Sequence, residues 1–141
     1  MSVNQISVFL ENKPGILCQL TEALAEAGIN MRAITLAEST NFGVVRILAE
    51  NTQSAMNVLI KEGFVAGLTP VLAYEIPNEA GGLNSLLKKI SEADINVKYM
   101  YSCLSSEGSS RAIMIFRVDN AQEAEEKLSG MGLVSLTDDQ M

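Results

Sequence analysis

The sequence repeats itself once, and this repeat constrains the fold more than any other feature. Residues of the first half match residues of the second half at an offset of 66 as far as Asn30, and at an offset of 69 from Asn51 onward. The matched pairs are Gly15 with Gly81, Leu20 with Leu86, Ala27 with Ala93, Ile29 with Ile95, Asn30 with Asn96, Asn51 with Asn120, Leu59 with Leu128 and Gly63 with Gly132. The three extra residues fall between 39–43 and 105–110, whose compositions are typical of a hairpin turn that tolerates insertion. The repeat predicts two copies of one structural unit.

Each copy shows the residue periods of four strands and two helices. Ile6, Val8 and Leu10 alternate with Gln5, Ser7 and Phe9, which indicates a strand with one buried face, and the next apolar residues recur at helical spacing as far as Gly28. In the first copy we expect strands over 5–10, 30–37, 43–49 and 65–69, and helices over 16–27 and 52–62. In the second we expect strands over 71–76, 96–104, 111–118 and 133–136, helices over 83–93 and from 120 to the stop at Gly132, and a frayed tail over 137–141.

The order βαββαβ, found twice, defines the predicted fold class. It is α+β, with two ferredoxin-like units whose antiparallel sheets each carry their helices on one face. We place the units at residues 1–69 and 70–141, because Thr69-Pro70 leads directly into the next strand with almost no linker.

Composition and charge exclude several classes of function. The formal net charge of −7, with ten Lys and Arg residues, disfavours nucleic acids and anionic membrane surfaces as partners. The apolar runs are shorter than the ~20 residues that a membrane helix needs, and the first residues lack a basic region followed by an apolar stretch, so we expect a cytoplasmic location. Cys18 and Cys103 lie far apart in a chain without histidine, which favours two buried thiols and neither a zinc site nor a Cys-His nucleophile. We expect no metal and no cofactor.

Two stretches join a predicted strand to a predicted helix and are the candidate functional corners. They read Asn12-Lys13-Pro14-Gly15-Ile16-Leu17 and Asn78-Glu79-Ala80-Gly81-Gly82-Leu83. A helix N-terminus presents unpaired N–H groups and about half a positive charge, which suits a carboxylate, and glycine allows backbone to approach a ligand closely. Because an asparagine side chain both donates and accepts hydrogen bonds, these corners predict binding of a zwitterion such as a free α-amino acid. A plain alternative is that Asn12 and Asn78 only cap or turn the chain into the helix.

The two corners differ in charge. Lys13 attracts a carboxylate, whereas Glu79 at the matching position repels it. The sequence therefore ranks the first corner above the second. It predicts that Asn12→Ala weakens ligand binding more than Asn78→Ala.

The whole pattern resembles the ACT domain family, and in particular small tandem ACT proteins. The resemblance rests on a strand, Asn-x-Pro-Gly-Ile, a helix, Ala-Gly-Ile-Asn and a second strand in the first copy, and the same pattern recurs in the second copy, over about Gln5 to Leu136 in all. The second loop departs from the family pattern, because Glu79-Ala80 replaces Lys-Pro. It implies a stand-alone regulatory module that holds an amino acid at an interface between such domains, often in a homodimer or larger assembly. In that family the first loop and an asparagine at the start of the second strand supply the ligand contacts. Here the corresponding residues are Asn12, Lys13, Pro14, Gly15, Ile16 and Asn30 in the first copy and Asn78, Glu79, Ala80, Gly81, Gly82 and Asn96 in the second.

These residues bear on four possible functions. The favoured one is a non-catalytic sensor that binds a small amino acid and reports it through its assembly or an enzyme of amino-acid metabolism. A ligand-free interaction module, or a regulatory subunit of a biosynthetic enzyme, is the alternative. An acylphosphatase-like enzyme is remote, because catalysis would need a nucleophile or base beside an electrophilic group. A nucleic-acid module would need aromatic residues on its central strands, where the chain has Val44-Val45-Arg46-Ile47 and Ile113-Met114-Ile115-Phe116.

Overall fold

The computed structural model describes residues 3–38, 41–103 and 111–141 of the chain, so the predicted hairpin turns over 39–43 and 105–110 lie partly or wholly outside the described residues. The chain divides into two compact units, residues 4–69 and residues 70–141 together with Val3. The elements in order are β1 (Val3–Glu11), α1 (Ile16–Glu26), β2 (Met31–Glu38), β3 (Phe42–Ala49), α2 (Thr52–Lys61), β4 (Val65–Pro77), α3 (Gly82–Glu92), β5 (Val97–Cys103), β6 (Arg111–Val118), α4 (Ala121–Gly130) and the short 3₁₀ helix η1 (Asp138–Gln140). The predicted order βαββαβ is thus confirmed for the first unit, and the second repeats it as far as α4.

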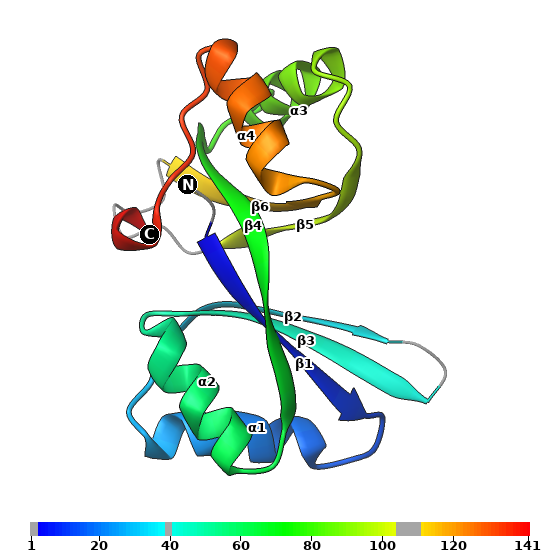
Figure 1. Ribbon diagram of the computed structural model, residues 1–141, viewed down its shortest axis with the longest axis vertical. Helices are drawn as coiled ribbons and strands as arrows, with labels where there is room; N and C mark the ends of the chain where they lie inside the picture. Colours follow the sequence, from blue (N-terminus) through cyan, green and yellow to red (C-terminus); the bar gives the residue numbers. More distant parts are fainter. Residues whose placement is uncertain (1–2, 39–40, 104–110) are drawn as a thin grey trace. The chain divides into compact units, whose positions relative to one another are not determined.

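In the first unit the hydrogen-bonded strand order is β2-β3-β1-β4, and α1 and α2 cover one face of this sheet (Figure 1). The antiparallel register sets Ile6 opposite Ile47 and Val8 opposite Val45. All four side chains are fully buried, and they pack against the apolar stripes of the two helices, as the period-two and period-3.6 patterns predicted. Gln5 is an exception, because this polar residue of the other strand face is fully buried and its amide donates to Ser7 Oγ at 3.0 Å.

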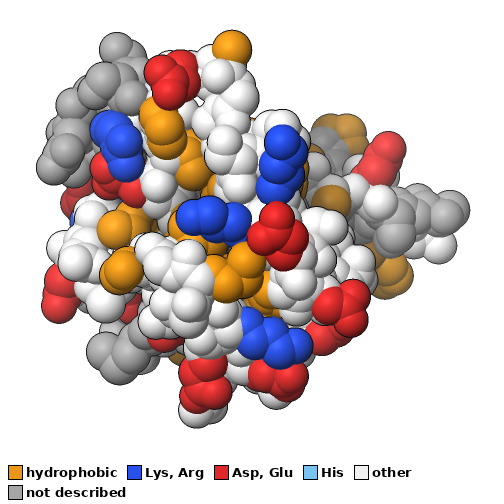
Figure 2. All heavy atoms as spheres, turned by 90° about the horizontal axis from the view of Figure 1, so that it is seen from above, with side chains coloured by type: hydrophobic (Ala, Val, Ile, Leu, Met, Phe, Trp, Pro, Cys, Tyr) orange, Lys and Arg blue, Asp and Glu red, His pale blue; other side chains and the backbone are white. Residues whose placement is uncertain are grey.

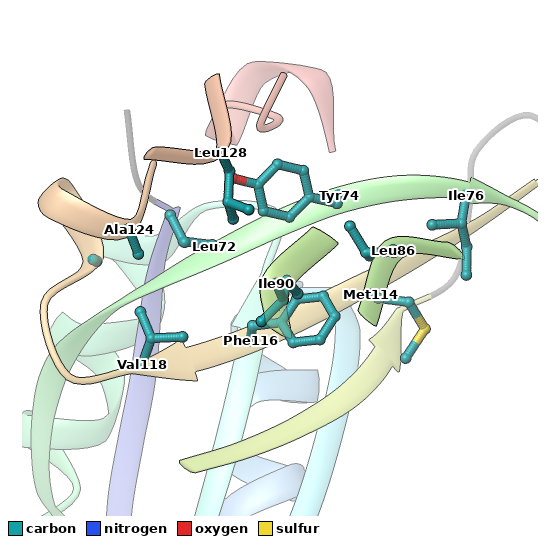
Figure 3. Packing of buried hydrophobic residues seen from close by; sticks show 11 residues of the cluster. Leu72, Tyr74, Ile76, Leu86, Ile90, Met114, Phe116, Val118, Ala124 and Leu128 are labelled. Atoms are coloured by element: carbon teal, nitrogen blue, oxygen red, sulfur yellow. The ribbon is translucent and has the colours of Figure 1, made fainter. Parts of the chain in front are cut away.

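The second unit has the strand order β4-β6-β5, with α3 and α4 on one face (Figure 1). Its core combines residues of β4, α3, β6 and α4, and Figure 3 shows how their side chains meet between the sheet and the helices. The labelled members are Leu72, Tyr74, Ile76, Leu86, Ile90, Met114, Phe116, Val118, Ala124 and Leu128. The Tyr74 and Phe116 rings lie 6.4 Å apart at 58°, a tilted arrangement that favours aromatic contact.

The predicted break between the last strand of the first copy, over 65–69, and the first strand of the second copy, over 71–76, is wrong. Residues 65–69 and 71–76 belong to one continuous strand, β4, in which Pro70 is an internal residue. Proline removes one backbone donor, but its fixed φ of about −65° is compatible with extended backbone. The strand therefore runs from the end of the first unit into the start of the second.

The predicted closing strand over 133–136 is also wrong, since this segment is irregular in the structure. Leu136 N–H donates to the Ala73 carbonyl at 2.8 Å, so the segment lies beside β4, but Val134 is 81% exposed. The tail beyond it was predicted to fray. Instead it forms η1, capped reciprocally by Thr137 and Gln140.

The prediction that both cysteine thiols are buried is wrong for one of them. Cys103 at the end of β5 is buried, whereas Cys18 lies on the exposed side of α1. No helix in the described part of the chain is long and apolar enough to cross a bilayer. On the face shown in Figure 2, basic and acidic side chains are interspersed among the described residues and form no continuous basic surface.

Candidate functional site

The first corner is an exposed turn between β1 and α1. Asn12 N–H donates to the Asn41 carbonyl at 3.1 Å, and Lys13 N–H donates to the Glu11 carbonyl at 3.0 Å. Gly15 then adopts φ +88°, the left-handed region, and serves as the N-cap residue of α1. A Cβ at this position would meet no atom within 4 Å, so the conformation, and not the available space, requires glycine here.

The second corner repeats this backbone path between β4 and α3. Gly81 has φ +89° and is the N-cap residue of α3, again with open space around a built Cβ. Gly82 differs, because its Cβ would lie 2.3 Å from the Pro77 carbonyl oxygen. The Gly82 N–H donates to the Glu79 carbonyl at 3.1 Å. The N–H and the hydroxyl of Ser85 both donate to the Gly81 carbonyl, each at 3.0 Å. Asn78, Glu79 and Ala80 are exposed.

The capping role considered for Asn12 and Asn78 is wrong. The N-cap residues are Gly15 and Gly81, and neither helix has a side-chain cap. By contrast, the other two α-helices are capped by asparagine: Asn51 Oδ1 accepts from Ser54 N–H at 3.0 Å, and Asn120 Oδ1 accepts from Glu123 N–H at 3.1 Å. The helices at the corners therefore begin without the side-chain oxygen that the other two possess.

Lys13 stands beside a carboxylate of its own chain. Its Nζ lies 3.3 Å from Glu11 Oε2, and both side chains are more than half exposed. Such a pair is weak in water, but it offsets part of the positive charge on which the ranking of the two corners depends. The ranking stays a prediction. Pro14 is an exposed residue of the turn, and Ile16 is the first residue of α1.

The strand asparagines lie at the opposite ends of the helices from the corners. Asn30 directly precedes β2, and its Nδ2 donates to Glu50 Oε1 at 3.0 Å. It borders a hollow of about 280 Å³ beside the start of α2, and Asn96 borders a smaller one of about 110 Å³ beside the start of α4. Because α1 and α3 each have eleven residues, a corner and its own strand asparagine are about 16 Å apart along the helix. The structure does not bring the two predicted halves of a site together within one unit.

A third hollow was not among the predicted sites. It has a volume of about 340 Å³ and lies in the second unit, between the end of β4, one face of α3 and the segment that follows α4. Gly82 of the second corner contributes to its wall, together with the ring of Tyr74. Burial, with a smaller contribution from the charge of Glu125, raises the pKa of Tyr74 to about 12. Aligning the two copies offers one signal for this hollow, because Gly82 stands where the first copy has Ile16.

Comparison with solved structures identifies the fold class. The chain is 32% identical to protein BT0572 from Bacteroides thetaiotaomicron, over 96% of this chain and 92% of that chain, with a TM-score of 0.87. It is also similar to the regulatory subunits of aspartate kinase from Thermus thermophilus (19% identity, 90% and 91% of the chains, TM-score 0.61) and from Thermus flavus (19%, 92% and 90%, TM-score 0.62). No curated protein matches the sequence.

These structures define a class of paired ferredoxin-like domains. The particular family follows from the sequence, because the family description of the ACT domain pair matches residues 1–140. The chain belongs to the ACT domain pair family, which confirms the resemblance and the fold class inferred from the repeat.

Proposed function

We propose that this protein is a non-catalytic regulatory module of the cytoplasm that binds a free α-amino acid at its two glycine corners. The observation that carries the proposal is the contrast among the four α-helices of the residues that the structure describes. Two begin with an Asn cap, whereas the two that follow the corners begin at exposed left-handed glycines without a side-chain cap. In α3 the N–H of Gly82 already donates to the Glu79 carbonyl, so a ligand carboxylate would be held by the N–H groups that follow it, and in α1 by those that follow Gly15. Membership of the ACT domain pair family supports the same role.

We further propose that a complete site needs two copies of the chain. Within a unit the helix separates the corner from the strand asparagine, so one chain would supply Asn12 or Asn78 and a second copy would supply Asn30 or Asn96. A homodimer is the smallest assembly that meets this requirement. Binding would then change the assembly, or its affinity for an enzyme of amino-acid metabolism.

Thermal unfolding against each of the twenty amino acids tests ligand binding. A ligand at a hundred times its dissociation constant adds about 2.7 kcal/mol to stability, a shift of several degrees for a chain of this size. Asn12→Ala and Asn78→Ala should reduce that shift, with the larger loss for Asn12→Ala. Asn57→Ala, on the exposed side of α2, is the control and should leave the shift unchanged. If no amino acid shifts the transition, the ligand-free regulatory subunit becomes the better interpretation.

Mixing two inactive variants tests the two-copy site. One carries Asn12→Ala and Asn78→Ala, and the other carries Asn30→Ala and Asn96→Ala. In mixed dimers the intact corners of one copy meet the intact strand asparagines of the other, which should restore about one quarter of the sites. A mixture that binds no more ligand than either variant alone would show that both halves must come from the same chain.

A further inference from the structure

The hollow of about 340 Å³ in the second unit lies against one face of α3. Gly82, Ser85 and Lys89 border it at spacings of three and four residues, so they share that face. The opposite wall is formed by Leu133 and Val134 after α4, and Ile76 of β4 lies at its base. Its volume is at the lower end of the range for small-molecule sites, so it suits a small ligand.

Two differences between the copies open this space. Gly82 replaces Ile16, and Leu133 replaces the larger Phe64, at matching positions of the repeat. In the first unit both Ile16 and Phe64 pack against the core. In the second, the close approach of Gly82 to the Pro77 carbonyl excludes any side chain at that position. The hollow is therefore specific to the sequence of the second copy.

The side chains that border the hollow include one positive charge that is not compensated. Lys89 stands where the first copy has Ala23, and among the residues that the structure describes it makes no ion pair or side-chain hydrogen bond. The other charged residue at the hollow, Glu75, is already paired with Arg111, whose Nε lies 2.7 Å from its Oε1. A cation without a partner beside mainly apolar walls matches an anion that carries an apolar group.

We propose that this hollow binds a small aliphatic carboxylate, with the carboxylate toward Lys89 and the hydrocarbon part between Ile76, Leu86 and Val134. The site lies within one unit, and Gly82 is the one residue of the predicted corner sites among those that border it. The ligand class includes aliphatic α-amino acids and the corresponding 2-oxo acids, which share the carboxylate and the branched chain.

Calorimetric titration with 4-methylpentanoate, leucine and 4-methyl-2-oxopentanoate tests the proposal. We expect 4-methylpentanoate to bind at least about tenfold more tightly than acetate, which lacks the apolar part, or 4-methylpentanol, which lacks the charge. Tighter binding of leucine than of the oxo acid would identify the amino acid as the ligand, and the reverse order would identify the oxo acid. The proposal is wrong if none of the three carboxylates binds, or if acetate or the alcohol binds as tightly as they do.

Two variants with matched controls locate the site. Lys89→Met keeps the side-chain length and removes the charge, and should weaken binding about tenfold or more, whereas Lys88→Met on the exposed side of the same helix should change it less than about twofold. Val134→Phe should fill the hollow and block binding, whereas Val65→Phe, at the matching exposed position of the first copy, should not.

Unchanged affinity in both Lys89→Met and Val134→Phe would overturn the assignment. Because neither variant touches Asn12 or Asn78, a loss here is distinguishable from failure of the corner sites.

Discussion

The phenol of Tyr74 provides the sharpest test of the packing in the second unit. Its side chain is 2% exposed, between the sheet and the helices (Figure 3), and within the described part of the chain its hydroxyl is buried without a hydrogen-bond partner. An unsatisfied buried polar group costs roughly 1–3 kcal/mol. Tyr74→Phe keeps the ring and its contact with Phe116 and removes only the oxygen. We therefore expect the variant to be more stable than the natural protein by about 1 kcal/mol at neutral pH.

The gain should grow in alkaline solution. The pKa of Tyr74 is raised from 10.0 to about 12 in the folded protein, first by burial and then by Glu125. Between these two values the folded state holds a proton that the unfolded state has lost, so the stability of the natural protein falls as pH rises. Each pH unit in that interval removes up to about 1.4 kcal/mol. The phenylalanine variant lacks this loss, so its advantage should reach about 2 kcal/mol near pH 11.

Urea unfolding followed by circular dichroism at pH 7.5, 9, 10.5 and 11 measures both effects as differences in midpoint at equal slope. Tyr99→Phe is the control, because this partly exposed ring stacks on Tyr101 at 6.4 Å and its loss of an oxygen should give no gain at neutral pH. If Tyr74→Phe is less stable at pH 7.5, the hydroxyl has a partner and the argument from burial fails. If the difference between the two proteins stays constant from pH 9 to 11, the raised pKa is wrong.

Two further predictions follow from backbone geometry and exposure. Gly81→Ala forces a left-handed φ on alanine, which should cost about 1–2 kcal/mol. Gly82→Ala imposes no such φ, but it places a Cβ 2.3 Å from the Pro77 carbonyl oxygen and should cost more. Urea unfolding of both variants would contradict this if the Gly82 variant were the more stable. Cys18 should react with a thiol reagent in the folded protein, and Cys103 only after unfolding, because Cys18 is exposed and Cys103 is buried. Mass spectrometry after a short labelling pulse measures this. Equal modification of both cysteines would refute the prediction.

Most of the secondary structure could be predicted because it depends on local periodicity. The alternation around Val8 and the helical spacing around Leu20 both follow from burying one face of an element, and the structure buries these residues fully. The closing segment after α4 could not be predicted in the same way. Its residues permit a strand, but whether a ladder forms depends on partners in β4, and there the described segment is held by Leu136.

The corners were recognised, but their local chemistry was not. Asparagine just before a helix suggested a cap, whereas the cap position falls three residues later, at Gly15 and Gly81. Composition alone does not reveal the left-handed φ of these glycines, because glycine also occurs where the backbone must approach another group closely. The helices predicted over 16–27 and 83–93 do lie between each corner and its strand asparagine, and their eleven residues in the structure keep the two apart within one unit.

The differences between the two copies carry information that the repeat itself does not. Tyr74 for Val8, Gly82 for Ile16, Lys89 for Ala23 and Leu133 for Phe64 are scattered over sixty residues of sequence, yet all four border one hollow. Substitutions that only preserve a core would keep it filled, whereas these remove volume at two positions and add a charge at a third. The charge of Lys13 alone favoured the first copy as the binding unit, but Glu11 offsets that charge in part and the second copy has the added hollow. Measuring the corner variants and the Lys89 variant on one ligand panel therefore decides whether the two copies share one role or have diverged to two.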